Sequence, residues 1–188
     1  MVDIGDSEGF WKKALPYIKP NLRGEAGPSL KLPPADAPVS RALNDDLLVL
    51  YLVDEGDRFS YVQGRHLPEG VDEQELFRTA IANLEEYVEG KIRVHRAGEV
   101  FAVILDGNFE ASLLLLDWLW AHSLREYAPS GPVVVVPSRD VLAFCDRNHS
   151  AGLEELAAVV SRVFPLGDHT ISQNYFQLSP SGWIRHDA

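Results

Sequence analysis

The sequence predicts an α+β protein in which three successive β-hairpin-plus-helix units form one mostly antiparallel sheet with helices packed on it. Short apolar runs rich in β-branched and aromatic residues come in pairs, with turn residues between the two members of each pair. Each pair precedes a longer segment with helical periodicity, and this order recurs three times along the chain. Hairpins joined by helices are typical of an α+β arrangement.

The first unit contains a strong helix signal. Strands are expected at Leu47–Val53 and Arg58–Val62, on either side of the turn Asp54–Asp57. A helix is expected over 72–89, where Asp72 is positioned to cap the N-terminus. The apolar stripe of this helix consists of Leu76, Phe77, Ala80, Ile81, Leu84 and Val88.

The next two units repeat the order of strand, strand and helix. The second is expected to comprise Ile92–His95, Val100–Ile104 and the helix Phe109–His122. The third is expected to comprise Val133–Val136, Val141–Cys145 and the helix Ser150–Val163. The four consecutive valines of the third unit predict a strand buried on both faces, and therefore a central one. A last hairpin is expected at Tyr175–Leu178 and Trp183–Ile184.

Residues 1–40 are expected to be an N-terminal extension that packs on a single α+β domain of residues 41–188. Phe10–Leu15 predicts a short helix, which Pro16 limits because proline disrupts a helix interior. Gly27–Pro38 is rich in proline and predicts an extended, loop-like segment.

The charge of the chain excludes several classes of partner. Its 188 residues include 17 Lys and Arg against 28 Asp and Glu, which gives a formal net charge of −11. Because nucleic acids and anionic membrane surfaces are bound through Lys and Arg, neither is an expected partner. No apolar run approaches the roughly 20 residues of a membrane-spanning helix, and no signal peptide is expected. With Cys145 as the single cysteine, the reducing cytoplasm is the expected location.

The sequence contains no recognisable catalytic motif, and we expect no catalytic residue, no cofactor and no metal ion. Glycine-rich phosphate loops, a serine nucleophile elbow and the paired histidines of zinc proteases are missing from it. Cys145 and His149 are four residues apart, but a single pair of ligands is a weak zinc signal. Cys145 ends an apolar run and is expected to be a buried structural thiol.

Ser138, Arg139 and Asp140 form the most interesting polar cluster, directly after the valine strand. Arg139 could hold a carboxylate or phosphate in a two-pronged contact. The alternative is a plain hairpin turn, for which Ser138 and Asp140 are ordinary residues. Asp106 or Asn108 is expected to cap the second helix. If all units run alike, Arg139 and Asp106 lie at opposite ends of the sheet, and one site shared by both is not expected.

Two of the expected helices suggest contacts with partners. The helix at 109–122 is apolar nearly all round, so either the aromatic N-terminal segment or a second copy in a homodimer should cover its outer side. The helix at 72–89 carries six acidic residues and one arginine. Glu85, Glu86 and Glu89 are candidate residues for docking a basic protein, because acidic surfaces attract such partners. The alternative for these residues is a merely solvated face.

Several short segments resemble a known protein family in their order and spacing. They are Leu15–Lys19, Leu47–Tyr51 with Asp54, Ala80 with Asn83 and Leu84, Ser112–Leu115, and Val133–Pro137 continuing into Ser138–Leu142. Over roughly residues 11–163 the chain resembles the YtpQ-like family of conserved bacterial proteins of unknown function, as a form shortened at the N-terminus. The resemblance implies the fold and a soluble bacterial protein, and it implies no activity.

The function expected from the sequence is that of a non-catalytic binding or protein-interaction module. One alternative is an acidic immunity or inhibitor protein that neutralises a basic partner. Another is an enzyme of unrecognised type, with Arg139 inside a pocket.

Overall fold

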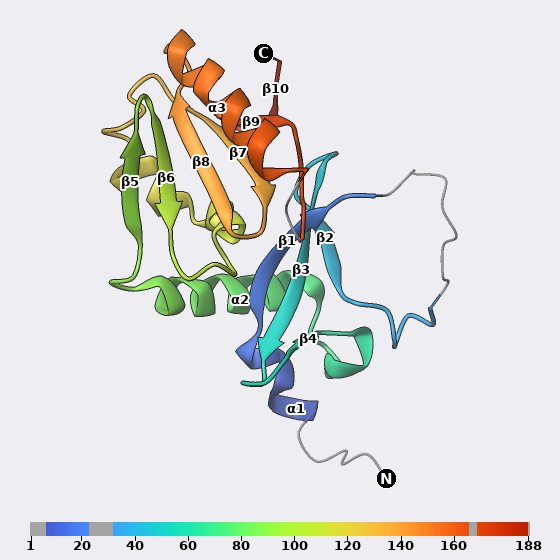
Figure 1. Cartoon of the computed structure of the whole chain (residues 1–188). Helices are drawn as coiled ribbons and strands as arrows, with labels where there is room; N and C mark the ends of the chain where they lie inside the picture. Colours follow the sequence, from blue (N-terminus) through green and yellow to red (C-terminus); the bar gives the residue numbers. More distant parts are fainter. Residues whose placement is uncertain (1–6, 23–31, 166–168, 188) are drawn as a thin grey trace.

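The computed structural model describes residues 7–22, 32–165 and 169–187. It contains two antiparallel sheets with helices packed against them, which confirms the α+β class (Figure 1). The expectation of one continuous sheet is wrong, because the first hairpin pairs with the N-terminal segment instead of joining the later strands. Residues 27–31 of the expected proline-rich segment lie outside the described residues.

The smaller sheet is built around its long strand β3 (Leu47–Asp54). The N-terminal strand β1 (Leu15–Pro20) pairs with one edge of β3, while β2 (Ser40–Ala42) and β4 (Phe59–Tyr61) follow one another along the other edge. Sequence reasoning missed β1 because it contains two prolines. Proline is compatible with an edge strand, where the missing N–H group faces away from the sheet, and β1 occupies such an edge.

The larger sheet has six strands in the order β10-β9-β7-β8-β6-β5. They span β5 (Arg93–Ala97), β6 (Val100–Ile104), β7 (Pro132–Ser138), β8 (Val141–Asp146), β9 (Tyr175–Ser179) and β10 (Gly182–His186). The prediction for Val133–Val136 is confirmed, because all four valines in β7 are fully buried. Val134 and Val136 belong to the main core of the molecule, and Val133 and Val135 to a smaller core on the opposite face.

Two long helices pack as their apolar stripes predict. In α2 (Glu73–Val88), Leu76, Ala80, Leu84 and Val88 are buried, and the Asp72 carboxylate accepts the backbone N–H of Glu75 at 2.9 Å. The helix α3 (Ser150–Val163) covers the smaller core through Leu156 and Val160. Short turns of helix complete the N-terminal half: α1 (Ser7–Phe10), η1 (Trp11–Lys13) and η2 (Gly64–His66).

The prediction of one continuous helix at 109–122 is wrong. The segment is broken into a 3-10 turn, η3 (Ala111–Leu115), and a π-helical turn, η4 (Leu119–Ser123). In a continuous α-helix the carbonyls of Leu113 and Leu114 would accept N–H groups four residues later. Here they accept the indole N–H groups of Trp120 and Trp183, at 2.9 and 2.8 Å. The segment packs against the N-terminal part of the chain, where the Tyr17 ring lies 6.0 Å from the Phe109 ring.

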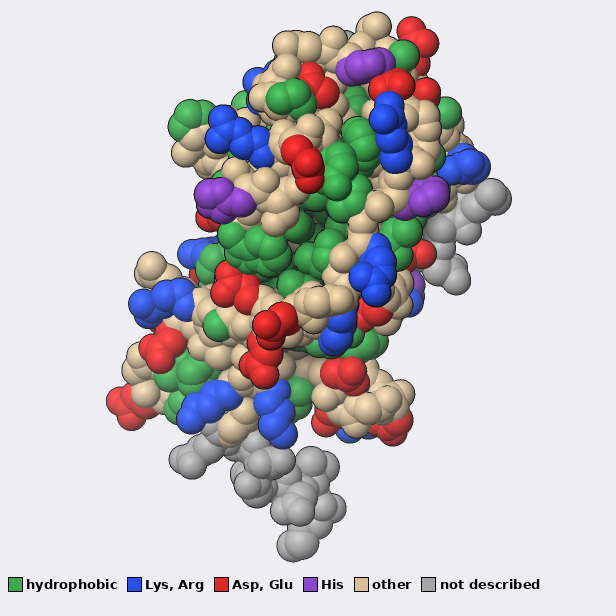
Figure 2. Space-filling view, turned by 90° about the vertical axis from the view of Figure 1, so that its left-hand side faces the viewer, with side chains coloured by type: hydrophobic (Ala, Val, Ile, Leu, Met, Phe, Trp, Pro, Cys, Tyr) green, Lys and Arg blue, Asp and Glu red, His purple; other side chains and the backbone are tan. Residues whose placement is uncertain are grey.

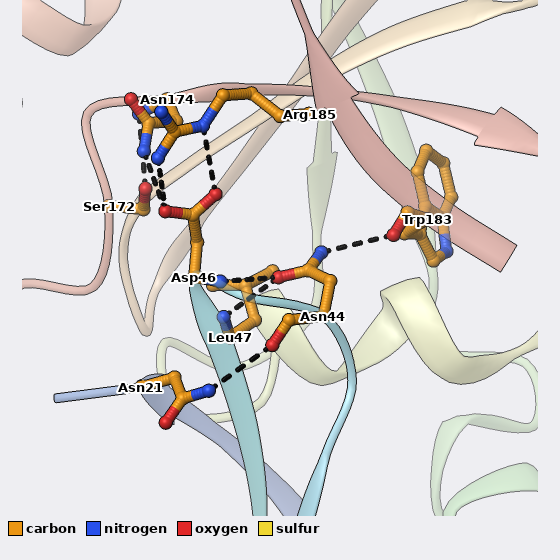
Figure 3. Close-up of polar contacts among 8 residues, drawn as sticks. All are labelled: Asn21, Asn44, Asp46, Leu47, Ser172, Asn174, Trp183 and Arg185. Atoms are coloured by element: carbon orange, nitrogen blue, oxygen red, sulfur yellow. Dashed lines mark hydrogen bonds and ion pairs between the residues drawn. The ribbon is translucent and has the colours of Figure 1, made fainter. Parts of the chain in front are cut away.

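A polar network joins the turn before β3 to the C-terminal strands (Figure 3). The Asp46 carboxylate accepts hydrogen bonds from both Nε and Nη2 of Arg185, and from the Asn174 amide at 3.0 Å. The Asn44 side chain donates to the carbonyl of Trp183 at 3.1 Å and accepts the backbone N–H groups of Asp46 and Leu47. These contacts link the two sheets at positions more than 120 residues apart in the sequence.

None of the described helices is long and apolar enough to cross a membrane.

Candidate functional site

The three glutamates expected to dock a partner line one groove at the C-terminal end of α2. The groove has a volume of about 540 Å³ and is lined by Glu85, Glu86, Val88, Glu89, Gly90, Ile92 and Trp118. We refer to these residues as the acidic groove. It lies on the side of the molecule that Figure 2 shows, where hydrophobic side chains gather in a hollow with acidic side chains below it.

Helix geometry explains why the glutamates face this groove. Leu84 and Val88 are four residues apart and turn towards the core, so Glu85, Glu86 and Glu89 are rotated towards solvent. All three glutamates are exposed.

The other wall of the groove depends on the break between η3 and η4. Trp118 lies at this break, immediately before η4, and its side chain is 38% exposed, although its neighbours Leu116 and Leu119 are buried. Sequence reasoning missed Trp118 because it assigned the residue to a fully buried helix. The break was not detectable as a periodicity, since the segment is apolar almost throughout.

No ion pair with a described residue balances the charge of the groove. None of the three glutamates forms an ion pair or side-chain hydrogen bond with another described residue. Elsewhere acidic side chains have such partners, as Glu73 pairs with Arg41 at 3.3 Å. The last turn of α2 contains no basic residue, and its backbone carbonyls add negative partial charge there. The groove therefore favours a cation supplied from outside.

The nearest lysine in the sequence packs on an aromatic ring and forms no ion pair with the three glutamates. The Lys91 ammonium lies over the ring of Tyr87, 4.1 Å from its centroid, and Lys91 is not among the groove residues. Tyr87 in turn packs on Phe109 and donates its hydroxyl to Asp106. Burial and the Asp106 carboxylate raise the pKa of Tyr87 to about 12, so the ring remains a neutral platform at physiological pH.

A second cavity, of about 320 Å³, lies near the turn between β5 and β6 and the end of β8. It is lined by Val94, Arg96, Glu99, Phe101, Glu126, Tyr127, Asp146 and His149. Several of its charged groups already have partners. Arg96 and His149 both contact the Glu99 carboxylate, at 3.2 and 3.4 Å, and His149 Nδ1 accepts the backbone N–H of Gly152 at the start of α3.

A third cavity, of about 470 Å³, borders the network of Figure 3. Asp46, Ser172 and Asn174 belong to its lining. Because the Asp46 carboxylate is occupied by Arg185 and Asn174, this cavity presents no free charge from that residue. Asp46 and Asn174 therefore serve to join the two sheets.

The Ser138–Asp140 cluster forms the turn between β7 and β8. Ser138 is buried and donates its hydroxyl to the Asp140 carboxylate at 2.5 Å, while Arg139 is partly exposed. Arg139 lines none of the three cavities described above. Burial and the nearby Arg139 guanidinium lower the pKa of Lys19, so a second cation lies close to this turn.

The expected separation of Arg139 from the Asp106 loop is wrong. Because β6 and β8 are antiparallel neighbours, the end of β6 lies beside the start of β8. The two segments are in direct contact, since the backbone N–H of Ala111 donates to the carbonyl of Arg139 at 3.0 Å. Neither Asp106 nor Asn108 caps a helix here: the Asp106 carboxylate accepts the N–H of Asn108 within the loop.

The buried carboxylate of Glu110 organises this loop. One of its oxygens accepts the backbone N–H groups of Leu105 and Gly107, at 3.0 and 2.8 Å, and the side chain is 2% exposed. A lone glutamate next to an apolar segment gives no sequence signal for such a role.

Cys145 is fully buried in β8, as expected. Burial, with smaller effects of Asp146 and Glu155, raises the pKa of its thiol to about 11, which opposes formation of a reactive thiolate. Within the described parts of the chain, His, Cys, Asp and Glu side chains form no group of three or more that could hold a metal ion.

Comparison with known proteins gives no match to a protein family, a curated protein or a solved structure. The resemblance to the YtpQ-like family therefore stays a prediction from the sequence.

Proposed function

We propose that the protein is a non-catalytic binding module that takes a basic side chain of a protein partner into the acidic groove. The observation that carries the proposal is that three carboxylates without a described ion-pair partner line the same groove as the partly exposed indole of Trp118. An indole face attracts a cation, and the attraction grows when the cation is partly removed from water. Carboxylates next to the indole would then hold the N–H groups of that cation.

Arginine fits this arrangement better than lysine. Its planar guanidinium stacks on an aromatic ring and donates two parallel hydrogen bonds to a carboxylate, whereas lysine presents a compact, strongly hydrated charge. A homodimer through this groove is disfavoured, since the groove would bring two surfaces of the same charge together.

The narrower alternative, an acidic immunity or inhibitor protein that neutralises a basic partner, would use the same groove. A cytoplasmic location belongs to this proposal too, and the single buried thiol agrees with it. The enzyme alternative has weaker support, since Arg139 lies on a turn and lines none of the three cavities.

The test uses the peptide acetyl-Gly-Arg-Gly-amide and its citrulline counterpart, which keeps the shape of arginine without the charge. We expect amide NMR signals of residues 85–92 and the indole signal of Trp118 to shift with the arginine peptide only. The affinity should fall about tenfold between low salt and 0.3 M salt, because exposed charges are screened over a few ångströms at that ionic strength. The variant E85Q/E86Q/E89Q should lose the response.

The control is E69Q/E75Q/E154Q, which changes the net charge equally at exposed glutamates that do not line the groove. If this control weakens binding as much as the groove variant does, the attraction is one of overall charge and the proposed site is wrong. An equal response to the citrulline peptide would contradict it as well.

A further inference from the structure

The strand β5 has a free backbone edge beside the acidic groove. It is the last strand of the larger sheet, paired with β6 on one side and with no described strand on the other. Such an edge presents N–H and C=O groups at alternate residues, and another extended segment can pair with them. Native proteins usually cover or blunt an edge of this kind.

The acidic groove and the second cavity lie on one face of this strand. Side chains alternate between the two faces of a strand, so Val94 and Arg96 point to the same side of β5, and Ile92 directly precedes the strand. Ile92 lines the acidic groove, and Val94 and Arg96 line the second cavity. The opposite walls are formed by Trp118 and Tyr127 respectively. In Figure 2 the hydrophobic hollow on this side of the molecule is open to solvent.

The charge of the chain disfavours a second copy at this edge. Each copy has a formal net charge of −11, so two copies repel one another, whereas a basic segment is attracted. The three glutamates of the acidic groove add a local attraction for such a segment. The occupant that the charges favour is therefore a basic segment of a different polypeptide.

We propose that an extended segment of the partner adds to β5 as a seventh strand of the larger sheet. Its basic residue lies beside Ile92, in the acidic groove, and an apolar residue two positions away lies beside Val94, over the second cavity. This inference rests on the proposed function, and it adds the conformation of the partner and the spacing of its anchoring residues. Backbone pairing supplies affinity, and the alternating side chains supply specificity.

The test uses two five-residue peptides that place arginine at the end of β5 nearest to α2. Acetyl-Arg-Thr-Val-Thr-Val-amide does so in a parallel strand, and acetyl-Val-Thr-Val-Thr-Arg-amide in an antiparallel one. We expect one of the two to shift the amide NMR signals of residues 92–97 and to slow hydrogen exchange at alternate residues of β5. Protection at alternate residues distinguishes backbone pairing from side-chain contact.

Two N-methylated forms of the binding peptide provide a matched control that leaves the protein unchanged. One carries N-methyl groups at odd positions and the other at even positions, so only one of them blocks the N–H groups that face β5. We expect that form to bind at least about tenfold more weakly, and the other to bind like the parent peptide; a tenfold change corresponds to about 1.4 kcal/mol.

The outcomes separate this inference from the proposed function. Equal weakening by both N-methylated forms, or no response of β5 to either peptide, would overturn strand addition. The arginine and citrulline peptides are too short to form a strand, so they would still show whether the acidic groove binds arginine. If E85Q/E86Q/E89Q binds both classes of peptide normally, the proposed function fails, whatever the N-methylated peptides do.

Discussion

At the scale of single residues, the glutamates of the acidic groove lie at the C-terminal end of α2, where negative charge is unfavourable. Acidic side chains stabilise the first turn of a helix and destabilise the last, because the terminal carbonyls there carry negative partial charge. In α2 the first turn carries Glu73 and Glu75, as expected, but the last turns carry Glu85 and Glu86. A sequence that departs from local preference in this way often does so at a functional site.

This argument predicts opposite effects for two chemically identical substitutions. Glu86→Gln removes a negative charge from the last turn and should raise the free energy of unfolding by about 0.3–1 kcal/mol at low salt. Glu75→Gln removes one from the first turn and should lower it by a similar amount. Urea unfolding at two salt concentrations measures both changes. Effects of the same sign in the two variants would show that the helix dipole does not govern these positions.

At the scale of secondary-structure elements, α3 packs closely on β8 at Gly152. A Cβ atom on Gly152 would lie 2.8 Å from Cβ of Cys145 and 3.3 Å from the carbonyl oxygen of Glu99. Glycine is otherwise unfavourable in a helix, by about 1 kcal/mol relative to alanine. Its presence at this position is explained by the contact, which lets the helix sit directly on the sheet.

Gly152→Ala should therefore destabilise the protein by about 1–3 kcal/mol, the usual effect of overfilling a packed core. Gly9→Ala is the control, because a Cβ atom there has no neighbour within 4 Å. Thermal unfolding of both variants gives the comparison. A stabilised G152A protein would mean that α3 can move away from β8 without loss of packing.

Elements defined by local pattern could be predicted from the sequence, and those defined by distant partners could not. The stripe of α2, its Asp72 cap and the valines of β7 follow from side-chain periodicity and burial, and all were found. The strand β1 depends on its pairing with β3, and the break before η4 depends on indole N–H groups that reach from Trp120 and Trp183. The candidate site combines both cases, since its glutamates were predicted and Trp118 was not.

At the scale of the whole molecule, the network of Figure 3 joins the turn before β3, in the smaller sheet, to the C-terminal strands of the larger sheet. A surface ion pair alone contributes little to stability. Here Asp46 also accepts a hydrogen bond from Asn174, and the neighbouring Asn44 side chain binds the carbonyl of Trp183. The connection is therefore a set of directional contacts and not one charge pair.

Asp46→Ala should lower the melting temperature by about 2–4 °C, the shift expected for a loss near 1 kcal/mol in a chain of this size. It should also speed hydrogen exchange in β10 more than in β5, which lies at the far edge of the same sheet. Asp45→Asn is the control, as Asp45 is exposed beside the network and forms none of its hydrogen bonds. Equal acceleration in both strands would show that the contacts do not act locally.

The exposure of Trp118 has an optical consequence. The chain contains four tryptophans, and the other three, Trp11, Trp120 and Trp183, are at most 5% exposed. A water-soluble quencher such as acrylamide thus reaches one fluorophore well before the rest, and that fluorophore is the wall of the acidic groove. Protection of Trp118 fluorescence from the quencher therefore measures occupancy of the acidic groove in the native protein, without an attached dye or tag.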